Sequence, residues 1–596
     1  MVLDALYEEA KTDSLSEQIA FCRKIDSFVE GREDIDILKK KIAFVSTSTM
    51  NGIKESLKAQ SAKHNLLLDV YLSEYNQFAQ EIINKKSNLY SFNPEVVFLH
   101  LDLRTLSGEN FFNPNEPSFE LNTWKFDTLN LFKDLIDRLI QDDKKVVVSL
   151  LEVPDINPLG VIEVSRKGLS RAVAEINLQL MSLSDEIENL FLFDYDNFLG
   201  KFGKKNTFDS KLYYLADIKL KPNYLSAFAR ELSIYLKALF ITPKKCLVLD
   251  LDNTLWGGVI GEAGLEGIDL GPEPAGRPFM EFQQYILSLH NRGIILAINS
   301  KNNLEDALNV INNHPHMILK EENFAAMEVN WNDKVRNLKS LASQINIGLD
   351  SMVFVDDDNY NREMVREFLP EVAVVNLPKE FSEYVSTMND LDYFSTLKIT
   401  DEDINKGKMY AQEKQRKNLQ EKSTDLTEYL EALRMECVIK IDDKENIQRI
   451  AQMTQKTNQF NMTTKRYVEK DITNFIDDEN TFVLTLSLSD KYGEYGTTGL
   501  AIVKNDSKWF IDTFLLSCRI LGRSAEEALM SEVISLAKLK GASEIFGSFI
   551  RTQKNVVAED AFESLGFKKN DDETFNWKFS LKKELPFPKS IKRIDS

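Results

Sequence analysis

Two acidic pairs follow short apolar stretches of the sequence, and together they could hold a metal ion. Asp250 and Asp252 come directly after the apolar run CLVL, and Asp356 and Asp357 come after the run MVFV. Residues two apart along a strand point to the same side, so Asp250 and Asp252 should converge where their strand ends. Carboxylates this close repel one another, and a divalent cation relieves the repulsion. An all-oxygen ligand set of this kind favours Mg²⁺.

A hydroxyl group and a lysine are expected at the same place. Ser300 lies just after the apolar run IILAI, and Lys334 begins a predicted helix. Open parallel sheets bind ligands at the carboxyl ends of their strands, where these groups should meet the two acidic pairs. Phosphoryl transfer needs a nucleophile, a metal ion, and cations or donors for the phosphoryl oxygens. The alternative, that the aspartates only cap strand ends, does not explain four such motifs in order.

The rest of the chain contains segments that could build the sheets around this centre. Two segments alternate short apolar strands with helical patterns, which is typical of parallel sheets covered on both faces. A charged stretch predicts a solvated helical linker, and the segment after it mixes strand and helix patterns. The fold class is therefore multidomain α/β. The expected parts are a helical lead-in (1–35), two doubly wound α/β domains (36–240 and 241–395), the linker (396–430), an α+β domain (431–582) and a basic tail (583–596).

The composition excludes several classes of protein. The 596 residues carry 93 acidic and 73 basic side chains, giving a net charge of −20, whereas a general nucleic-acid-binding protein needs a basic surface. No apolar run approaches the ~18 residues of a membrane helix, and the N-terminus has no signal-peptide pattern. Four cysteines lie far apart in the sequence, as is typical of reduced thiols. We therefore expect a cytoplasmic protein with no nucleic-acid or membrane partner.

The four motifs resemble those of the haloacid dehalogenase superfamily: D-x-D-x-T, a downstream Ser, a Lys and a terminal acidic pair. The resemblance implies that Asp250 attacks phosphorus and becomes an aspartyl phosphate. It also implies that Asp252 is the general acid and base and offers its backbone carbonyl to Mg²⁺. The remaining implied residues are Ser300 and Lys334 as catalytic groups, Asp250, Asp252, Asp356 and Asp357 as metal ligands, and Asn253, Thr254, Gly257, Gly258 and Lys301 as substrate-binding groups.

A longer match, over about 36–582, is to the FkbH-like proteins. It is carried by the strings DLDNTLWGGVIGE from Asp250, SKNN from Ser300, NWxxK ending at Lys334 and VFVDD ending at Asp357, with TQKTNQFN and DTFLLSCRILGR in the third domain. The resemblance implies loading of a glyceryl or similar acyl unit from a phosphorylated donor, such as 1,3-bisphosphoglycerate, onto an acyl carrier protein with loss of phosphate. The alternatives are a phosphatase acting on a sugar phosphate in polysaccharide biosynthesis and a weakly catalytic adaptor that docks a carrier protein.

One position departs from the glyceryl-loading pattern. Those proteins commonly carry a cysteine before the Ser-Lys-Asn motif, where this chain has Asn299. An amide cannot form a thioester, so either another residue carries the acyl group or no covalent acyl-enzyme forms. Cys518 is the one cysteine within a family motif and is therefore the alternative acyl carrier. A small buried packing residue is the simpler interpretation of that cysteine.

The third domain resembles the GNAT acyltransferase fold. A strand ending at Leu516 leads into a predicted helix, whose first N–H groups with Arg519 and Arg523 are expected to bind the pyrophosphate of coenzyme A or phosphopantetheine. Gly522 and Asn555 belong to the same predicted acyl-donor site. The alternative is a scaffold that only docks a partner. The TQKTNQFN run is interpreted as a surface loop, with acyl recognition as its alternative.

The first domain resembles the SGNH-hydrolase fold. Its first strand ends at the hydroxyl-rich stretch 46–49, where that family carries its nucleophilic serine, but Lys221 stands where the family's histidine would precede a proline. A serine without a base is a poor nucleophile, so we expect a non-hydrolytic domain. His100 lies in an apolar strand and is expected to be a core histidine.

A carrier-protein partner would need a basic surface on this acidic chain. Acyl carrier proteins are typically acidic, so docking requires local complementarity of charge. The basic stretches Lys414–Lys422 and Lys589–Arg593 are the candidates. The other expected partner is a phosphorylated small-molecule substrate.

Overall fold

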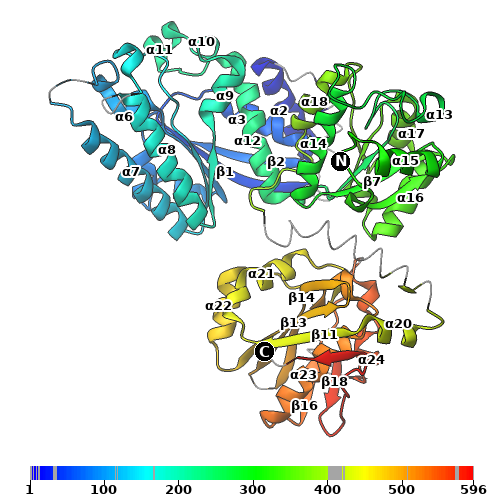
Figure 1. Cartoon of the computed structure of the whole chain (residues 1–596). Helices are drawn as coiled ribbons and strands as arrows, with labels where there is room; N and C mark the ends of the chain where they lie inside the picture. Colours follow the sequence, from blue (N-terminus) through cyan, green and yellow to red (C-terminus); the bar gives the residue numbers. More distant parts are fainter. Residues whose placement is uncertain are drawn as a thin grey trace. The chain divides into compact units, whose positions relative to one another are not determined.

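The computed structural model describes most of the chain, which forms three separate sheets (Figure 1). By its internal contacts the chain divides into one unit of Met1–Pro243 with Asp392–Lys398 and another of Lys244–Leu391 with Ile399–Ser596. No helix in the described part of the chain has the length and apolar character that spanning a membrane requires. The described residues are 3, 6, 7, 10, 14–30, 37–114, 116, 118–164, 168–399, 416, 419–420, 423–506, 508–552, 554–570 and 576–594.

The first unit contains five parallel strands in the order β2-β1-β3-β4-β5, with helices on both faces. The strands are β1 (Leu38–Ser46), β2 (Leu66–Leu72), β3 (Val96–His100), β4 (Lys145–Ser149) and β5 (Leu190–Phe193), and the longer helices are α2 (Leu15–Val29), α3 (Ile53–Ala62), α7 (Leu121–Gln141), α8 (Leu169–Glu186) and α12 (Leu225–Phe240). Neighbouring residues of β1 pack on opposite faces: Phe44 lies in a core with residues of α3 and α12, and Val45 in a core with residues of α7 and α8. Burial on both faces explains why these strands read as continuous apolar runs.

The hydroxyl-rich end of β1 lies beside a buried ion pair rather than a catalytic histidine. Thr47 Oγ1 donates a hydrogen bond to the carboxylate of Asp102 at 2.6 Å, and Lys219 Nζ pairs with the same carboxylate. The predicted histidine counterpart, Lys221, instead donates to the carbonyl of Asn206 at 2.8 Å. Lys219 is therefore the cation that faces this sheet edge. The non-hydrolytic character of the domain stays a prediction.

His100 is the core histidine that the sequence predicts. Its ring is 3% exposed and its Nδ1 lies 2.9 Å from Ser149 Oγ. Burial lowers the pKa of His100 to about 4, so the ring is neutral at physiological pH.

Glu152 gives this unit a predicted dependence of stability on pH. Burial and the charge of Asp102 raise the pKa of Glu152 from 4.5 to about 8. The folded protein therefore holds this proton more tightly than the unfolded chain. The resulting stabilisation is complete below the unfolded pKa and is lost as the pH rises through the folded pKa. It amounts to on the order of 1.4 kcal/mol in the free energy of unfolding for each unit by which the two pKa values of Glu152 differ.

We expect Glu152→Gln, which cannot ionise, to remain stable where the wild type weakens. Thermal unfolding of the two proteins followed from about pH 5 to about pH 9 should show similar melting temperatures at the acidic end and a higher one for the variant at the basic end. Melting profiles that stay parallel over this range would contradict the assigned shift.

The second unit contains two sheets, the first of which has five parallel strands in the order β10-β9-β6-β7-β8. Its strands are β6 (Cys246–Leu249), β7 (Ile295–Ser300), β8 (Phe324–Val329), β9 (Met352–Val355) and β10 (Ala373–Val374), and its longer helices are α14 (Arg277–Asn291), α15 (Leu304–Asn313), α16 (Lys334–Ile345) and α17 (Asn359–Phe368). The central strands β6, β7 and β9 are entirely buried. All their carboxyl ends lie along one edge, as the sequence predicts.

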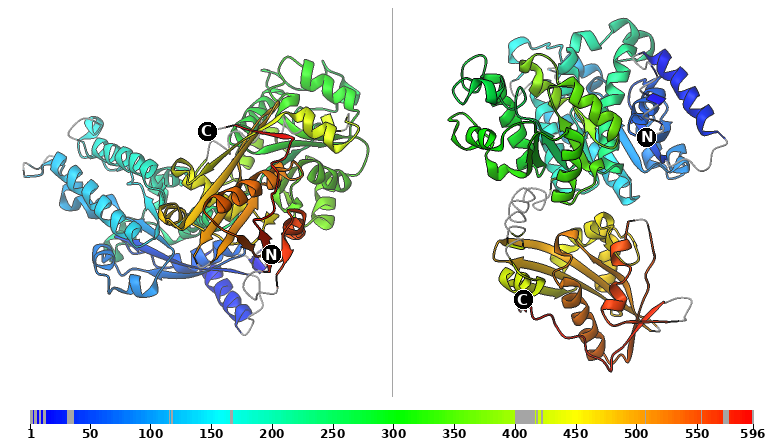
Figure 2. Two further views of the ribbon diagram at one scale, coloured as in Figure 1. Left: turned by 90° about the horizontal axis from the view of Figure 1, so that it is seen from below. Right: turned by 90° about the vertical axis from the view of Figure 1, so that its right-hand side faces the viewer.

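The other sheet of this unit has nine strands and is mostly antiparallel at its centre, where β13, β14 and β15 lie side by side (Figure 2). The path runs β17-β18-β16-β15-β14-β13-β11-β19, and β12 pairs with β15 off this path. The strands are β11 (Met435–Ile441), β12 (Phe460–Asn461), β13 (Thr481–Asp490), β14 (Gly493–Asn505), β15 (Trp509–Leu516), β16 (Glu544–Gly547), β17 (Lys568–Lys569), β18 (Trp577–Ser580) and β19 (Ile591–Arg593), with helices α20 (Leu426–Leu433), α21 (Ile447–Lys456), α22 (Glu469–Asp477) and α23 (Ala525–Leu539). The predicted fold class, multidomain α/β with an α+β third part, is confirmed.

The predicted basic tail is partly a strand. β19 extends the nine-stranded sheet by pairing in parallel with β11, and its two cations form ion pairs, Lys592 with Glu436 and Arg593 with Glu532. Most of the other predicted basic stretch, Lys414–Lys422, lies outside the described residues. The domain boundaries and both docking surfaces stay predictions.

Candidate active site

The structure brings three of the four predicted carboxylates together at the end of β6. Oxygen atoms of Asp250, Asp356 and Asp357 all lie within 4.8 Å of one another. The backbone N–H of Asp250 donates to the carbonyl of Val355 at 2.9 Å, which fixes the end of β6 against the end of β9. The two acidic pairs converge because their strands are parallel neighbours.

Lys334 lies between two of these carboxylates. Its Nζ is 2.9 Å from Asp250 Oδ1 and 3.0 Å from Asp356 Oδ2, and it donates to the carbonyl of Asn299 at 2.7 Å. The residue is 3% exposed, so three acceptors satisfy the three hydrogens of a buried ammonium group. Burial alone would lower the pKa of Lys334, but the charges of Asp250 and Asp356 raise it above its usual value. Lys334 is therefore charged whenever the site is intact.

The single positive charge of Lys334 does not balance three carboxylates. The pKa values of Asp356 and Asp357 are therefore raised. Burial and the charge of Asp250 raise the pKa of Asp356 to about 7, against the attraction of Lys334. Burial and Asp250 also raise the pKa of Asp357 to about 6. A divalent cation would relieve this repulsion, and a set of three carboxylate oxygens suits Mg²⁺. The residues present therefore fit the predicted metal.

The carboxylate of Asp252 lies outside this group of three and has donors of its own. Oδ1 accepts hydrogen bonds from Trp256 Nε1 at 2.9 Å and the backbone of Ile260 at 3.1 Å, and Oδ2 accepts from Asn302 Nδ2 at 2.8 Å. Burial nevertheless raises the pKa of Asp252 above its usual value. Three fixed donors and a raised pKa suit a group that holds and releases a proton. A metal contact by Asp252 would come from its backbone carbonyl.

The other predicted substrate-binding residues form the loop after β6 and its neighbour after β7. Thr254 is fully buried and its Oγ1 has no hydrogen-bond partner. Asn253 has a φ of 52°, and its side chain accepts from the backbone of Gly258 at 2.9 Å. A Cβ at Gly257 would lie 2.8 Å from the ring of Phe279, so the loop needs glycine there. The predicted roles of these groups stay untested.

Ser300 and Lys301, the two predicted residues at the end of β7, differ in their exposure to solvent. Ser300 is the last residue of β7 and is buried, at 1% exposure. Lys301 is exposed, and its Nζ donates to Asn361 Oδ1 at 3.3 Å. Asn361 in turn donates to both carboxylate oxygens of Asp356 at 3.3 Å, so Lys301 is connected to the acidic group through one side chain.

Sequence reasoning missed several residues that hold these groups in place. Arg362 is buried, and its NH1 donates to the carbonyls of Asp356 and Asp357 at 2.7 and 2.6 Å. Asn302 and Asn361 donate to the catalytic and metal-binding aspartates. A signal was present: both asparagines and the arginine lie within a few residues of the predicted motifs. Their side-chain directions could not be inferred from spacing.

Asn299, at the place of the missing cysteine, is a structural residue. It is fully buried, its Nδ2 donates to the carbonyl of Lys334 at 3.0 Å, and its Oδ1 accepts from Asn337 at 3.1 Å. These bonds tie β7 to the first turn of α16. The amide therefore positions the helix that carries Lys334, and the chain has no thiol at this position.

The predicted acyl-donor residues of the third domain are spread over a turn, a helix start and a loop. Arg519 lies in the short helical turn after β15, and Gly522 has a φ of 72°. Arg523 and Asn555 are buried, at 5% and 0% exposure. Cys518 is exposed, so the interpretation that it is a buried packing residue is wrong. The other three cysteines are buried.

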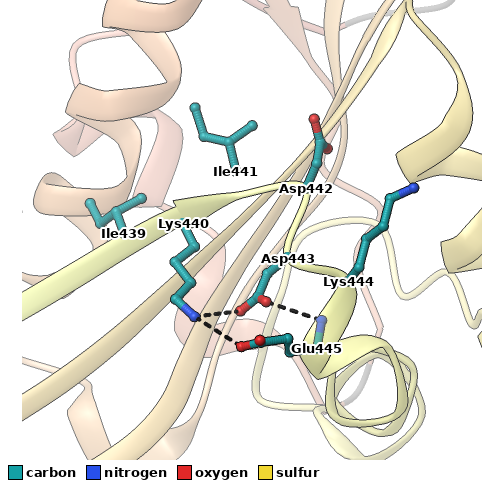
Figure 3. Close-up of a pocket in the computed structure, with 7 residues that line it drawn as sticks. All are labelled: Ile439, Lys440, Ile441, Asp442, Asp443, Lys444 and Glu445. Carbon is teal, nitrogen blue, oxygen red and sulfur yellow. Dashed lines mark hydrogen bonds and ion pairs between the residues drawn. The ribbon is translucent and has the colours of Figure 1, made fainter. Parts of the chain in front are cut away.

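A surface pocket of about 560 Å³ lies at the end of β11 and contains none of the predicted residues (Figure 3). Lys440 Nζ lies 3.5 Å from Asp443 and 3.8 Å from Glu445 within the pocket, and Lys444 pairs with Asp477 outside it at 2.8 Å. We assign it no part in the predicted chemistry.

Comparison with known families matches two regions of the chain. Residues 41–234 match the N-terminal domain of FkbH, and residues 245–373 match the NLI interacting factor-like phosphatases. None of the curated proteins matches the sequence. The two matched regions correspond to the two five-stranded parallel sheets.

Comparison with solved structures gives a match over more than half of the chain. The N-terminal part of the protein BF1531 from Bacteroides fragilis, containing a phosphatase domain and complexed with Mg, is 29% identical, and the match covers 62% of this chain and 97% of that chain with a TM-score of 0.57.

Matches to acetyltransferases are much weaker. An acetyltransferase of the GNAT family from Desulfovibrio desulfuricans is 10% identical over 24% of this chain and 99% of its own, with a TM-score of 0.20. YncA from Salmonella typhimurium, solved with acetyl-CoA, is 13% identical over 26% and 98%, with a TM-score of 0.19. The sheet around Asp250 belongs to a phosphatase domain of the haloacid dehalogenase type, and the chain is an enzyme that carries an FkbH-type N-terminal domain.

Proposed function

We propose that this enzyme transfers a phosphoryl group from a small phosphorylated substrate to Asp250 and then to water, with Mg²⁺ as its metal. The observation that supports this most directly is the arrangement of Asp250, Asp356 and Asp357 within 4.8 Å of one another with Lys334 between two of them. A nucleophile, a metal site and a cation are thereby gathered at one sheet edge.

The chain's own residues supply the steps. A carboxylate oxygen of Asp250 attacks phosphorus, the bond from phosphorus to the leaving oxygen breaks, and Asp252 gives its proton to that oxygen. Asp252 then takes a proton from the water that attacks the aspartyl phosphate, which releases phosphate and restores Asp250. Lys334 fixes the orientation of Asp250 throughout, because its ammonium group holds Oδ1 at 2.9 Å.

Asp250, Asp356 and Asp357 would hold the metal, with the backbone carbonyl of Asp252 as a further ligand. When bound, Mg²⁺ supplies positive charge that balances the carboxylates and the phosphoryl oxygens. The structure of the Bacteroides fragilis protein with Mg supports this choice of ion.

Coupling to acyl transfer is the finer part of the proposal. The match of residues 41–234 to the N-terminal domain of FkbH supports it. The resemblance of the chain to FkbH-like proteins implies an acyl phosphate donor and a carrier protein. In this proposal the carrier thiol or amine attacks the carbonyl carbon of a glyceryl or similar acyl phosphate, loses its proton and displaces that phosphate. A second phosphate, held as an ester on the same unit, is transferred to Asp250 and then to water. Intact-mass spectrometry of acyl carrier proteins after incubation with the enzyme, Mg²⁺ and phosphorylated glycerates tests the coupling. A gain in carrier mass is expected, and unchanged carriers with steady phosphate release would favour a plain phosphatase.

Removal of the metal tests the phosphoryl chemistry. We expect EDTA to reduce phosphate release from p-nitrophenyl phosphate to the background rate, because the three carboxylates then repel the substrate's phosphoryl group. Excess Mg²⁺ should restore the original rate, measured in the same sample. Full turnover in EDTA would exclude a metal-dependent site.

A further inference from the structure

The nine-stranded sheet contains one place where two parallel strands separate. β15 and β16 pair only through Phe510 and Ile511 with Phe546 and Gly547, and β15 continues to Leu516 beyond that pairing. In sheets with parallel strands, ligands bind at the point where two adjacent strands separate. The pantetheine arm of coenzyme A carries two amides, which could pair with the uncovered edge of β15 as an added strand. This gap is therefore where the predicted acyl donor would have to lie.

The gap is filled by the chain itself. β12 pairs antiparallel with the end of β15, Phe460 opposite Leu516 and Asn461 opposite Leu515. The next residue, Met462, donates its N–H to the carbonyl of Phe514 at 3.1 Å. On its other side, its carbonyl accepts from the N–H of Ile550 at 2.8 Å. The segment thus bridges β15 and the chain that follows β16, and uses the backbone groups that a pantetheine arm would need.

Two buried asparagines hold this segment in place. Asn555 Nδ2 donates to the carbonyls of Asn461 and Ile550, each at 2.9 Å. Asn461 accepts from the N–H of Thr464 at 2.9 Å and donates to the carbonyl of Thr457 at 3.2 Å. Both asparagines are fully buried. Asn555, predicted to bind the acyl donor, instead has its amide group committed to β12.

The far end of the predicted site does not suit a pyrophosphate. The first turn of α23 carries Glu526 and Glu527, and Glu526 Oε2 is buried with no hydrogen-bond partner. Carboxylates already occupy the positive end of this helix and would repel a second anion. The guanidinium of Arg523 donates to the Tyr495 hydroxyl and lies over the same ring, 4.8 Å from its centroid. Of the two arginines predicted to bind the pyrophosphate, Arg523 is therefore buried, whereas Arg519 is half-buried.

We infer that the third domain holds no coenzyme A, because β12 and Met462 permanently occupy the position of the acyl donor's arm. The residues present fit neither end of coenzyme A. The edge of β15 leaves no place for its pantetheine arm, and the start of α23 does not suit its pyrophosphate. The third domain then contributes no acyl-CoA chemistry, and any acyl group that this enzyme handles is not delivered to that sheet by coenzyme A. The inference does not depend on the chemistry at Asp250.

Titration calorimetry of the full chain with acetyl-CoA tests this directly. We expect no saturable heat up to about 1 mM ligand, well above the concentrations at which coenzyme A-dependent enzymes are occupied. Hydrogen–deuterium exchange of the same sample should show slow exchange at Met462 and Ile550, unchanged by acetyl-CoA. Saturable one-to-one binding would overturn the inference, as would loss of protection over 460–462 on addition of the ligand.

Two variants separate the strand's role from general unfolding. Asn555→Ala removes the hydrogen bonds to the carbonyls of Asn461 and Ile550 and should speed exchange at Met462. Gln459→Ala, at an exposed neighbouring position, should not. Phosphate release is expected to stay unchanged in both. Slow exchange at Met462 in the Asn555 variant would show that the asparagine does not hold the strand, and would contradict its assigned part.

Discussion

Replacing Asp250 with Asn is expected to reduce phosphate release by at least ~10³-fold, since an amide can neither attack phosphorus nor serve as an anionic metal ligand. The replacement also removes one of the two carboxylates paired with Lys334 and one of the three carboxylates of the metal site. Steady-state phosphate release from p-nitrophenyl phosphate in saturating Mg²⁺ measures the effect.

Asp350→Asn is the matched control for this prediction. Asp350 is exposed and comes just before β9, at the edge opposite the carboxyl ends, so its loss should leave the rate unchanged. Substantial turnover in the Asp250 variant would remove the nucleophile from the proposal, whatever the metal dependence shows.

The second large effect is expected for Lys334→Met, which leaves Asp250 and Asp356 buried without their shared cation. Breaking a buried ion pair by removing one partner typically costs about 3–5 kcal/mol of stability, and phosphate release should fall by ~10²-fold or more because the nucleophile loses its orienting charge. The two carboxylates should then rely on the metal alone, so the melting temperature of the variant should rise more with added Mg²⁺ than that of the wild type.

Lys339→Met on the same helix is the control, because Lys339 is exposed and should change neither quantity. Equal Mg²⁺-dependent stabilisation of the Lys334 variant and the wild type would mean that the lysine and the metal do not share these carboxylates. A stable, inactive variant would still support an orienting role for Lys334.

The central features of the phosphoryl site could be predicted because they follow from local rules. Apolar runs fixed the ends of β6 and β9, and parallel order brings carboxyl ends to one edge, so the convergence of Asp250 with Asp356 needed no side-chain detail. The side chains that support these aspartates could not be predicted in the same way. Arg362 and Asn302 act through the direction of single side chains, which sequence spacing does not determine.

The third domain shows where sequence reasoning ends. The polar run TQKTNQFN suggested a surface loop, but its last two residues form β12, which is buried. The edge of β15, more than fifty residues later in the sequence, needs a partner for its backbone groups, and β12 supplies it. The end of the chain suggested a basic tail, but part of it forms β19, which pairs with β11 at the edge of the sheet. In both cases the deciding contact is far away in sequence, and charge or polarity in the segment itself gives no sign of it.

Asn299 has a structural role at the position where glyceryl-loading proteins commonly carry a cysteine. Its amide is fully used between β7 and α16, so a cysteine placed there would have to replace structural hydrogen bonds as well as gain a function. An acyl group, if transferred, goes directly from the phosphorylated donor to its acceptor or through another residue.

The measurement that tests the central claim most directly is mapping of the phosphoryl-enzyme. The enzyme is mixed with p-nitrophenyl phosphate and Mg²⁺, quenched in acid within one turnover, digested and examined by mass spectrometry. We expect a single phosphoryl adduct on the peptide that contains Asp250, located on that residue and absent from Asp250→Asn. Phosphate release without any adduct on this peptide, or an adduct on another residue that turns over at the catalytic rate, would contradict it.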